Sequence, residues 1–183
     1  MEKIDSKIIF NEADRVALLF GAISGGYIFI SQALALLNTQ VLGSILSVIL
    51  WAGKFVGCIL LMRFFMKRLM RSYEGVTRQN LLGYGTLIAL FSAIITAACG
   101  YIAIQYVFPD QTKEIFDTAY QTYAGMLDSN AMASMEKIEN NFGLISLISN
   151  LIWCFVYGWL LSVIMSSSLA GSGKKNIFDD DDI

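Results

Sequence analysis

The stretch that decides the fold is VLGSILSVILWAGKFVGCILLMRFF, residues 41–65, in which Lys54 and Arg63 are the only charged residues. A helix rises about 1.5 Å per residue, so this stretch can cross a hydrocarbon core about 30 Å thick. Backbone polar groups cannot stay unpaired in lipid, so the stretch predicts a transmembrane helix. Three other long apolar runs, all without Asp or Glu, predict further spans at residues 16–37, 81–108 and 142–169.

The composition agrees with a membrane protein. The 183 residues are 56% hydrophobic with a mean hydropathy of +0.59, which exceeds the apolar share of ordinary soluble domains. We therefore expect an all-α integral membrane protein folded as a four-transmembrane-helix bundle. Its parts would be a cytoplasmic N-terminal segment (1–15), a membrane domain (16–169) and a flexible, acidic cytoplasmic tail (170–183) that follows a serine- and glycine-rich linker from Ser166.

The basic residues predict the orientation. Ten Lys and Arg residues fall before span one, between spans two and three, or after span four, whereas Lys113 and Lys137 alone lie on the opposite side. Cytoplasmic loops carry the excess of positive charge, so both termini are expected in the cytoplasm.

A cleaved signal peptide is the alternative interpretation of the first apolar run, because Ala33-Leu34-Ala35 resembles a cleavage site. Two features oppose it. The preceding segment carries Glu2, Asp5, Glu12 and Asp14, and the run is longer than the usual h-region. A retained span is therefore favoured.

The external segment 109–141 predicts a short helical hairpin over the outer end of the bundle. It carries six acids and two bases, which leaves a net charge of −4. Apolar residues such as Ile115, Ala119 and Tyr123 recur at helical spacing. Asp110 is expected to be the N-cap of the first helix, and Asp128-Ser129-Asn130 to form the turn.

Small residues four apart in every span predict close helix packing. The pairs are Gly21/Gly25, Gly53/Gly57, Ala93/Ala97 and Gly158/Ser162. Packing within one bundle is favoured over a dimer interface, because each span carries such a pair.

Lys54 is the single charged residue at mid-membrane depth, which makes it a candidate binding residue. No carboxylate lies in any other span. Helical rise places Ser24, Thr96, Cys154 and Tyr157 at a similar depth, and these groups can hydrogen-bond an ammonium without neutralising it. Three interpretations stay open: an uncharged lysine, a lysine that faces a wet crevice, or a lysine that meets an acidic group of a lipid or a second protein. Snorkelling of the lysine towards an interface is the structural alternative.

A basic cluster after span two supplies the other candidate binding residues, Arg63, Lys67, Arg68 and Arg71. If the helix continues past the membrane, Arg63, Lys67 and Arg71 share one face and could attract anionic lipid or an acidic partner. Setting the topology is the simpler role for the same charges, and it is favoured.

Catalysis and metal binding have little support. Histidine is missing, and the three cysteines all lie in apolar runs, so no nucleophile–base pair or metal site can be assembled. A net charge of −2 gives no reason to expect nucleic-acid binding. We expect no enzyme activity, no cofactor and no metal.

Several short motifs resemble a bacterial family of membrane proteins. They are Met70-Arg71-Ser72-Tyr73-Glu74-Gly75, Gly83-Tyr84-Gly85, Gly100-Tyr101-Ile102, and the run from Gln105 to Asp110. The sequence is similar here to domain-of-unknown-function family 4199 (DUF4199), found mainly in Bacteroidota. The resemblance implies the bacterial inner membrane and a setting in envelope assembly near a polyprenyl-phosphate glycosyltransferase, but it implies no catalytic residues.

The favoured function is a non-enzymatic inner-membrane subunit or scaffold that binds a second membrane or membrane-associated protein. A small carrier or lipid-binding protein that uses Lys54 for an anionic group is the alternative. Membrane lipid and a second copy of the chain are the other expected partners.

Overall fold

The computed structural model describes residues 2–36, 40–123, 125–126 and 128–173. Within them the chain forms six α-helices, one π-helical turn and two two-residue strands. Their bounds are β1 (Glu2–Lys3), α1 (Ser6–Ala35), α2 (Gln40–Ser72), β2 (Tyr73–Glu74), α3 (Arg78–Ile102), η1 (Ala103–Val107), α4 (Pro109–Tyr123), α5 (Ser129–Asn140) and α6 (Phe142–Gly173). Four helical segments are long and apolar enough to cross a membrane. The prediction of an all-helical protein with four such segments is confirmed.

The long helices extend beyond the apolar runs because polar residues cap them. Asp5 accepts a hydrogen bond from the backbone N–H of Ser6 at 2.6 Å, so α1 begins well before residue 16. The Thr77 hydroxyl accepts from the N–H of Asn80 at 3.3 Å at the start of α3. Since α2 continues unbroken to Ser72, the basic residues after residue 62 lie on the helix itself.

Two details of the segment after span three differ from expectation. The helix α4 begins at Pro109, so Asp110 lies in the first helical turn and the prediction that it is the N-cap is wrong. Proline suits this first position because the N–H it lacks would have no helical partner. Asp128 caps α5 through the N–H of Ala131 at 2.7 Å, and Ser129 is already helical, so these residues start a helix where a turn was predicted.

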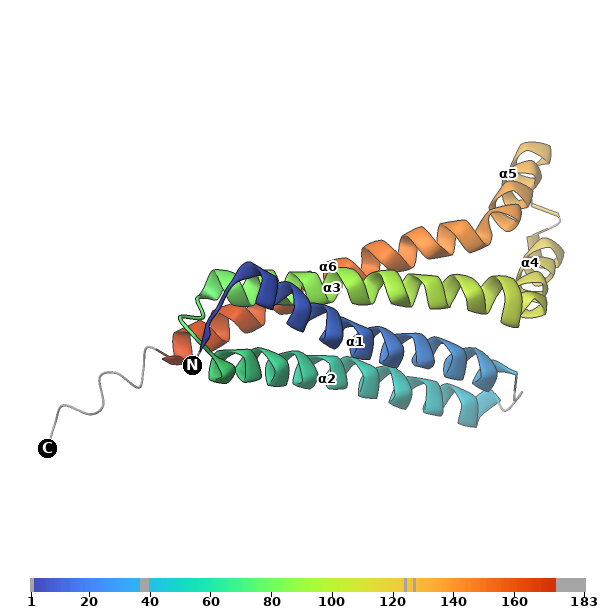
Figure 1. Cartoon of the computed structure of the whole chain (residues 1–183). Helices are drawn as coiled ribbons and strands as arrows, with labels where there is room; N and C mark the ends of the chain where they lie inside the picture. Colours follow the sequence, from blue (N-terminus) through green and yellow to red (C-terminus); the bar gives the residue numbers. More distant parts are fainter. Residues whose placement is uncertain (1, 37–39, 124, 127, 174–183) are drawn as a thin grey trace, which may run out of the picture.

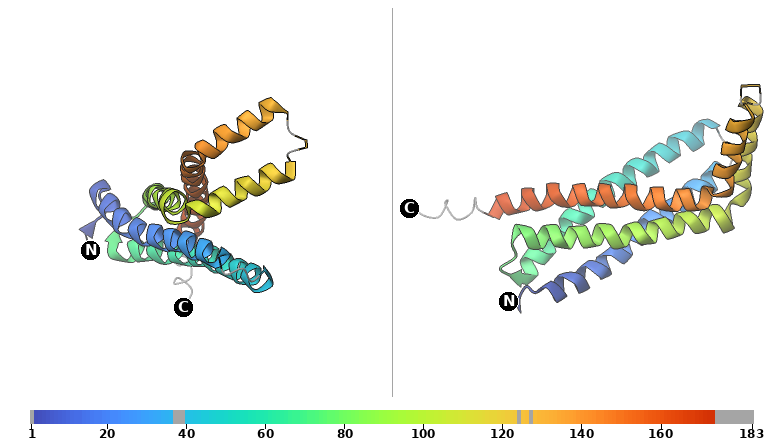
Figure 2. Two further views of the ribbon diagram at one scale, coloured as in Figure 1. Left: turned by 90° about the vertical axis from the view of Figure 1, so that its right-hand side faces the viewer. Right: turned by 90° about the horizontal axis from the view of Figure 1, so that it is seen from above.

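The helix α3 is the centre of the assembly. It packs along α1 on one side and α6 on the other, while α2 lies at the edge and contacts α1, α6 and α3 less extensively (Figures 1 and 2). In the most apolar window of α3, 39% of residues are buried, against 11% in α2. The helices lie closest at the end that carries the start of α1, and they diverge towards the end that carries α4 and α5 (Figure 1).

Close approach to α3 depends on residues without bulky side chains. A Cβ on Gly25 would lie 2.6 Å from the Cys99 sulfur, and one on Gly158 would lie 2.6 Å from the Ala89 Cβ. Ala93 and Ala97 are buried between the same helices. Three of the four predicted small-residue pairs therefore pack within the chain. Gly53 and Gly57 are the exception, because nothing lies within 4 Å of a Cβ built on either.

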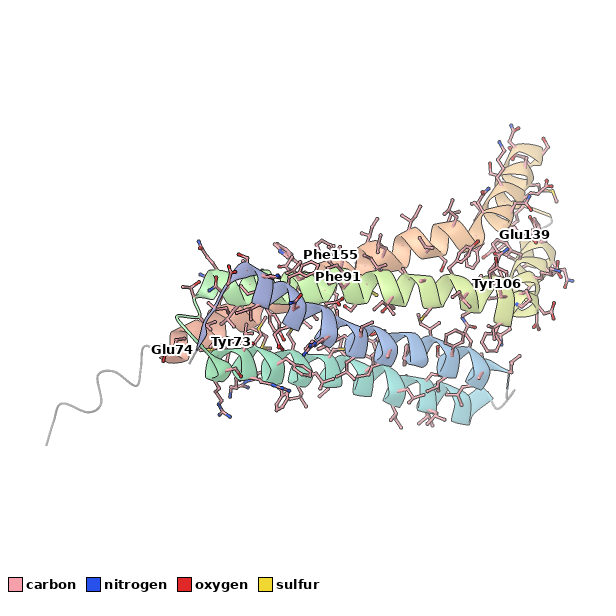
Figure 3. All side chains as sticks on the ribbon, viewed as in Figure 1. Tyr73, Glu74, Phe91, Tyr106, Glu139 and Phe155 are labelled. Carbon is pink, nitrogen blue, oxygen red and sulfur yellow. The ribbon has the colours of Figure 1, made fainter. Side chains whose placement is uncertain are left out.

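The strands and several polar contacts tie together the end where the chain enters α1. The strand β1 pairs in parallel with β2, and Tyr73 and Glu74 lie at this end of the molecule (Figure 3). Gly75 follows with a φ of 74°, a conformation that favours glycine. Arg78 donates to the Ser167 hydroxyl at 2.8 Å, which links the start of α3 to the last turns of α6. We call this end of the bundle the basic end, because the basic residues of α1, α2 and α3 gather there.

The helices α4 and α5 lie at the opposite end, across the direction of the long helices (Figure 2). Phe116 of α4 is buried against Phe142 of α6, with ring centroids 5.3 Å apart. Tyr120 donates to the Glu139 carboxylate at 3.1 Å and so joins α4 to α5. Partial burial, this hydrogen bond and the nearby acids raise the pKa of Tyr120 above its usual range, so the hydroxyl keeps its proton.

The chain past span four is helical for longer than the sequence suggested. The helix α6 continues through Ser166–Ser168 to Gly173, where a flexible linker was expected. Ser166 and Ser167 both donate to the carbonyl of Val163, which satisfies their hydroxyls inside the helix. Residues 174–183 of the predicted acidic tail lie outside the described residues, as do residues 37–39 of the predicted turn.

The glycine contacts generate a matched pair of substitutions. We expect Gly158→Ala to destabilise the protein by about 1–3 kcal/mol, because the added methyl group overpacks α6 against Ala89 and the α3 backbone. Gly53→Ala adds the same group in open space and should leave stability unchanged or slightly raised through helix propensity. Thermal unfolding of the purified protein in detergent measures both, and equal effects would contradict the packing scheme.

Candidate functional site

Lys54 lies where α2 leaves the core. The buried side of α2 is formed by Cys58, Met62, Met66 and Leu69, all in its second half. Lys54 occupies the next position of this side, one turn before Cys58, and it is half-buried. Its ammonium nitrogen lies 4.6 Å from the centre of the Tyr27 ring on α1. A cation over an aromatic face is attracted by the ring quadrupole, most strongly where water is excluded.

A small cavity of about 70 Å³ lies beside Lys54 inside the bundle. Ser24, Thr96, Cys154 and Tyr157, which the depth count from the sequence selected, all line it. The Tyr157 hydroxyl is buried and has no hydrogen-bond partner among the described residues. Buried polar groups are normally satisfied, and this cavity is large enough to hold water beside the hydroxyl.

A larger crevice of about 350 Å³ opens between α2 and α6 at the same level. Aromatic residues dominate its walls: Trp51 and Phe55 stack with ring centres 5.6 Å apart, and Phe55 meets Tyr157 at 5.1 Å across the helix pair. Trp153 completes the α6 side and is 76% exposed. Lys54 is the one charged residue among the described residues that line either cavity.

The site is suited to bind a group that accepts hydrogen bonds and carries negative charge. An ammonium provides three donors and a positive charge, and the apolar walls strengthen any electrostatic contact by excluding water. No carboxylate lines either cavity among the described residues. Within the same part of the chain, no group of three or more His, Cys, Asp or Glu residues could hold a metal ion.

The structure separates the remaining predicted binding residues from Lys54. Arg63, Lys67 and Arg71 are exposed on α2 at four-residue spacing, and Arg63 stands nine residues along the helix from Lys54, about 13 Å by helical rise. Arg68 lines a different cavity, together with Arg15. The predicted residues therefore form a mid-membrane site at Lys54 and a separate group at the basic end.

Sequence reasoning missed Tyr27, Trp51 and Trp153. Trp51, Lys54, Phe55 and Cys58 follow a helical spacing of three and four residues, so the periodicity around Lys54 could have identified the α2 wall. Tyr27 lies one helical turn from Ser24, the residue that depth alone selected. The lysine contacts Tyr27 and not only residues at its own depth, because its long side chain places the ammonium group about one helical turn away from its backbone.

Comparison with known proteins adds no assignment: no family model, no curated protein and no solved structure matches the chain. The resemblance to family 4199 of the domains of unknown function therefore stays a prediction.

The contact between Lys54 and Tyr27 generates a double-mutant cycle. We expect Tyr27→Leu to lower the free energy of unfolding by about 1 kcal/mol more than Tyr27→Phe, because phenylalanine keeps an aromatic face for the cation. In a Lys54→Met background this difference should fall to the part that packing alone contributes. Unfolding in detergent supplies the four free energies, and a difference that is undiminished without the lysine would rule out the cation–π contact.

Proposed function

We propose that the protein is a non-enzymatic subunit or scaffold of the bacterial inner membrane that holds a second membrane protein beside α2. The observation that carries this proposal is Lys54, a cation at mid-span in an aromatic crevice that no described carboxylate lines. A lysine at the bilayer centre costs about 2.5–3.5 kcal/mol on insertion scales. An Asp or Glu on a partner helix would offset that cost, because opposite charges attract strongly where water is excluded.

The proposed arrangement in the membrane is a four-helix bundle with both termini in the cytoplasm and α4–α5 as an external hairpin. Two observations support it. Lys7, Arg15 and the basic residues of α2 gather at one end, as the positive-inside rule requires of the cytoplasmic side. The start of α1 and the end of α6 lie at this same end (Figure 1), as an even number of spans demands.

The outer face of α2 supports a helical partner. Gly53 and Gly57 are spaced as in helix pairs that approach closely in membranes, and no side chain of this protein packs on them. The other small-residue pairs are used within the chain, so this one is left for a neighbour. The resemblance to the Bacteroidota family suggests an envelope glycosyltransferase that acts on polyprenyl phosphate as that neighbour.

The test is a pull-down of the natively expressed, internally tagged protein from mild detergent, with stoichiometry measured by mass spectrometry. We expect one membrane protein near one to one with the wild type. Lys54→Met should weaken the complex by at least about tenfold, because it removes the charge at similar volume. The matched control is Lys7→Met, the same change at an exposed position of α1; it should leave the complex intact.

A charge exchange then identifies the contact. Lys54→Glu should abolish the complex, and replacement of the partner's acidic residue by lysine should restore it. Recovery of the protein alone, or only with itself, would refute the subunit proposal.

A lipid-binding or carrier function is the second candidate, favoured by the size of the crevice. A volume of about 350 Å³ is within the range of small-molecule sites. An anionic group of a lipid or solute would then take the place of the partner carboxylate. A specific lipid that co-purifies with the wild type and is lost in Lys54→Met would favour this function over the subunit.

A further inference from the structure

A third cavity, of about 320 Å³, lies at the basic end between α1 and α2. Its polar part is formed by Glu12 and Arg15 of α1, Arg68 and Ser72 of α2, and Tyr73 of β2. Tyr84 of α3 also lines it, and at 2% exposure this tyrosine is held firmly in the core. The cavity is therefore distinct from the Lys54 crevice in position, helices and charge.

The lining changes from polar to apolar along the helices. Arg15 and Arg68 mark the polar part, whereas Leu19 and Phe65 lie one turn further towards the middle of the spans. Leu19 is 43% exposed, so the apolar part is open to the surroundings. Because α1 and α2 run antiparallel, both walls change character at the same level. A ligand that fits must have a polar head and an apolar body, in the order in which a membrane lipid presents them.

The charges of the cavity favour an anion of one unit. Two guanidinium groups and one carboxylate leave a net charge of +1. Both arginines are exposed, so a ligand can reach their guanidinium groups. Guanidinium groups match phosphate oxygens in geometry and can bind them through two parallel hydrogen bonds. A phosphodiester carries one negative charge, whereas a phosphate monoester approaches two.

We propose that this cavity binds the phosphodiester headgroup of a phospholipid of net charge −1, with Arg15 and Arg68 on the phosphate and an acyl chain along Leu19 and Phe65. The depth agrees with this assignment. Arg15 directly precedes the apolar run that starts at Val16, and Arg68 lies three residues after the run that ends at Phe65, so both arginines are at the level of lipid headgroups. Glu12 restricts the site to singly charged heads and excludes phosphate monoesters.

The experiment is native mass spectrometry of the full chain released from nanodiscs that contain phosphatidylglycerol in phosphatidylcholine. We expect one tightly retained phosphatidylglycerol per protein. Arg68→Gln and Arg15→Gln should each reduce retention about tenfold, as expected from the loss of a hydrogen bond to a charged group. Lys7→Gln is the matched control: it removes a positive charge at an exposed position of α1 that does not line the cavity, and retention should not change.

The role of Glu12 and the source of the phosphate are tested separately. Glu12→Gln should increase retention of phosphatidic acid, a monoester, several-fold relative to phosphatidylglycerol. Displacement of the lipid by millimolar inorganic phosphate would show a soluble anion site and overturn the proposal. Equal losses in Lys7→Gln and Arg68→Gln would also overturn it, because they would indicate surface attraction only. Lys54→Met should leave retention unchanged, so the result is independent of the proposed subunit function.

Discussion

The close approach of α3 to α1 and α6 is the interaction on which the rest of the structure depends. Helices gain little from hydrophobic burial when the surrounding lipid is equally apolar, so they associate through tight packing. Gly21 and Gly25 of α1 lie on α3, and Gly158 of α6 lies on Ala89 of α3. A helix with small residues towards two neighbours becomes the centre of the assembly, which is the position of α3 (Figure 1).

The position of α2 follows from the same constraint. Its small residues Gly53 and Gly57 do not face α3, and its contact with the core is made by larger side chains such as Met62 and Met66. Among the described residues, the buried side chains of α2 end at Cys58, and the next position on this side holds Lys54. Since a charge without a carboxylate is costly to bury, α2 cannot continue the buried apolar contact there. The divergence of the helices beyond this level, and the crevice that results, are consistent with that single residue.

The sequence predicted the parts of the structure that depend on composition, periodicity and length. Four apolar helices and the residues at the depth of Lys54 could be found this way, because membrane thickness and helical rise determine them. The contact of Lys54 with Tyr27 could not, since it depends on the path of a flexible side chain between two helices. Nor could the sequence show which glycine pair stays outside the core: Gly53/Gly57 has the same spacing as Gly21/Gly25, and only the rotation of α2 distinguishes them. The helical path through Ser166–Ser168 was missed because composition alone ignores hydroxyl bonding to the preceding turn.

Both candidate sites use α2, and they differ because the two levels of the membrane differ. In the proposed arrangement, a cation at mid-span has little water around it, so a helix with a carboxylate at the same depth would suit it. The basic end would lie among the phosphate groups of lipids, so two arginines beside an apolar wall would suit a lipid. The helix α2 has the sparsest packing onto α3. Its Phe65 contacts Phe20 of α1 beside the cavity at the basic end, and its Phe55 contacts Tyr157 of α6 beside the Lys54 crevice. Ligands in the Lys54 crevice and in the cavity at the basic end would each fill space beside α2. Both would therefore stabilise the position of α2, which has the fewest contacts with the other spans.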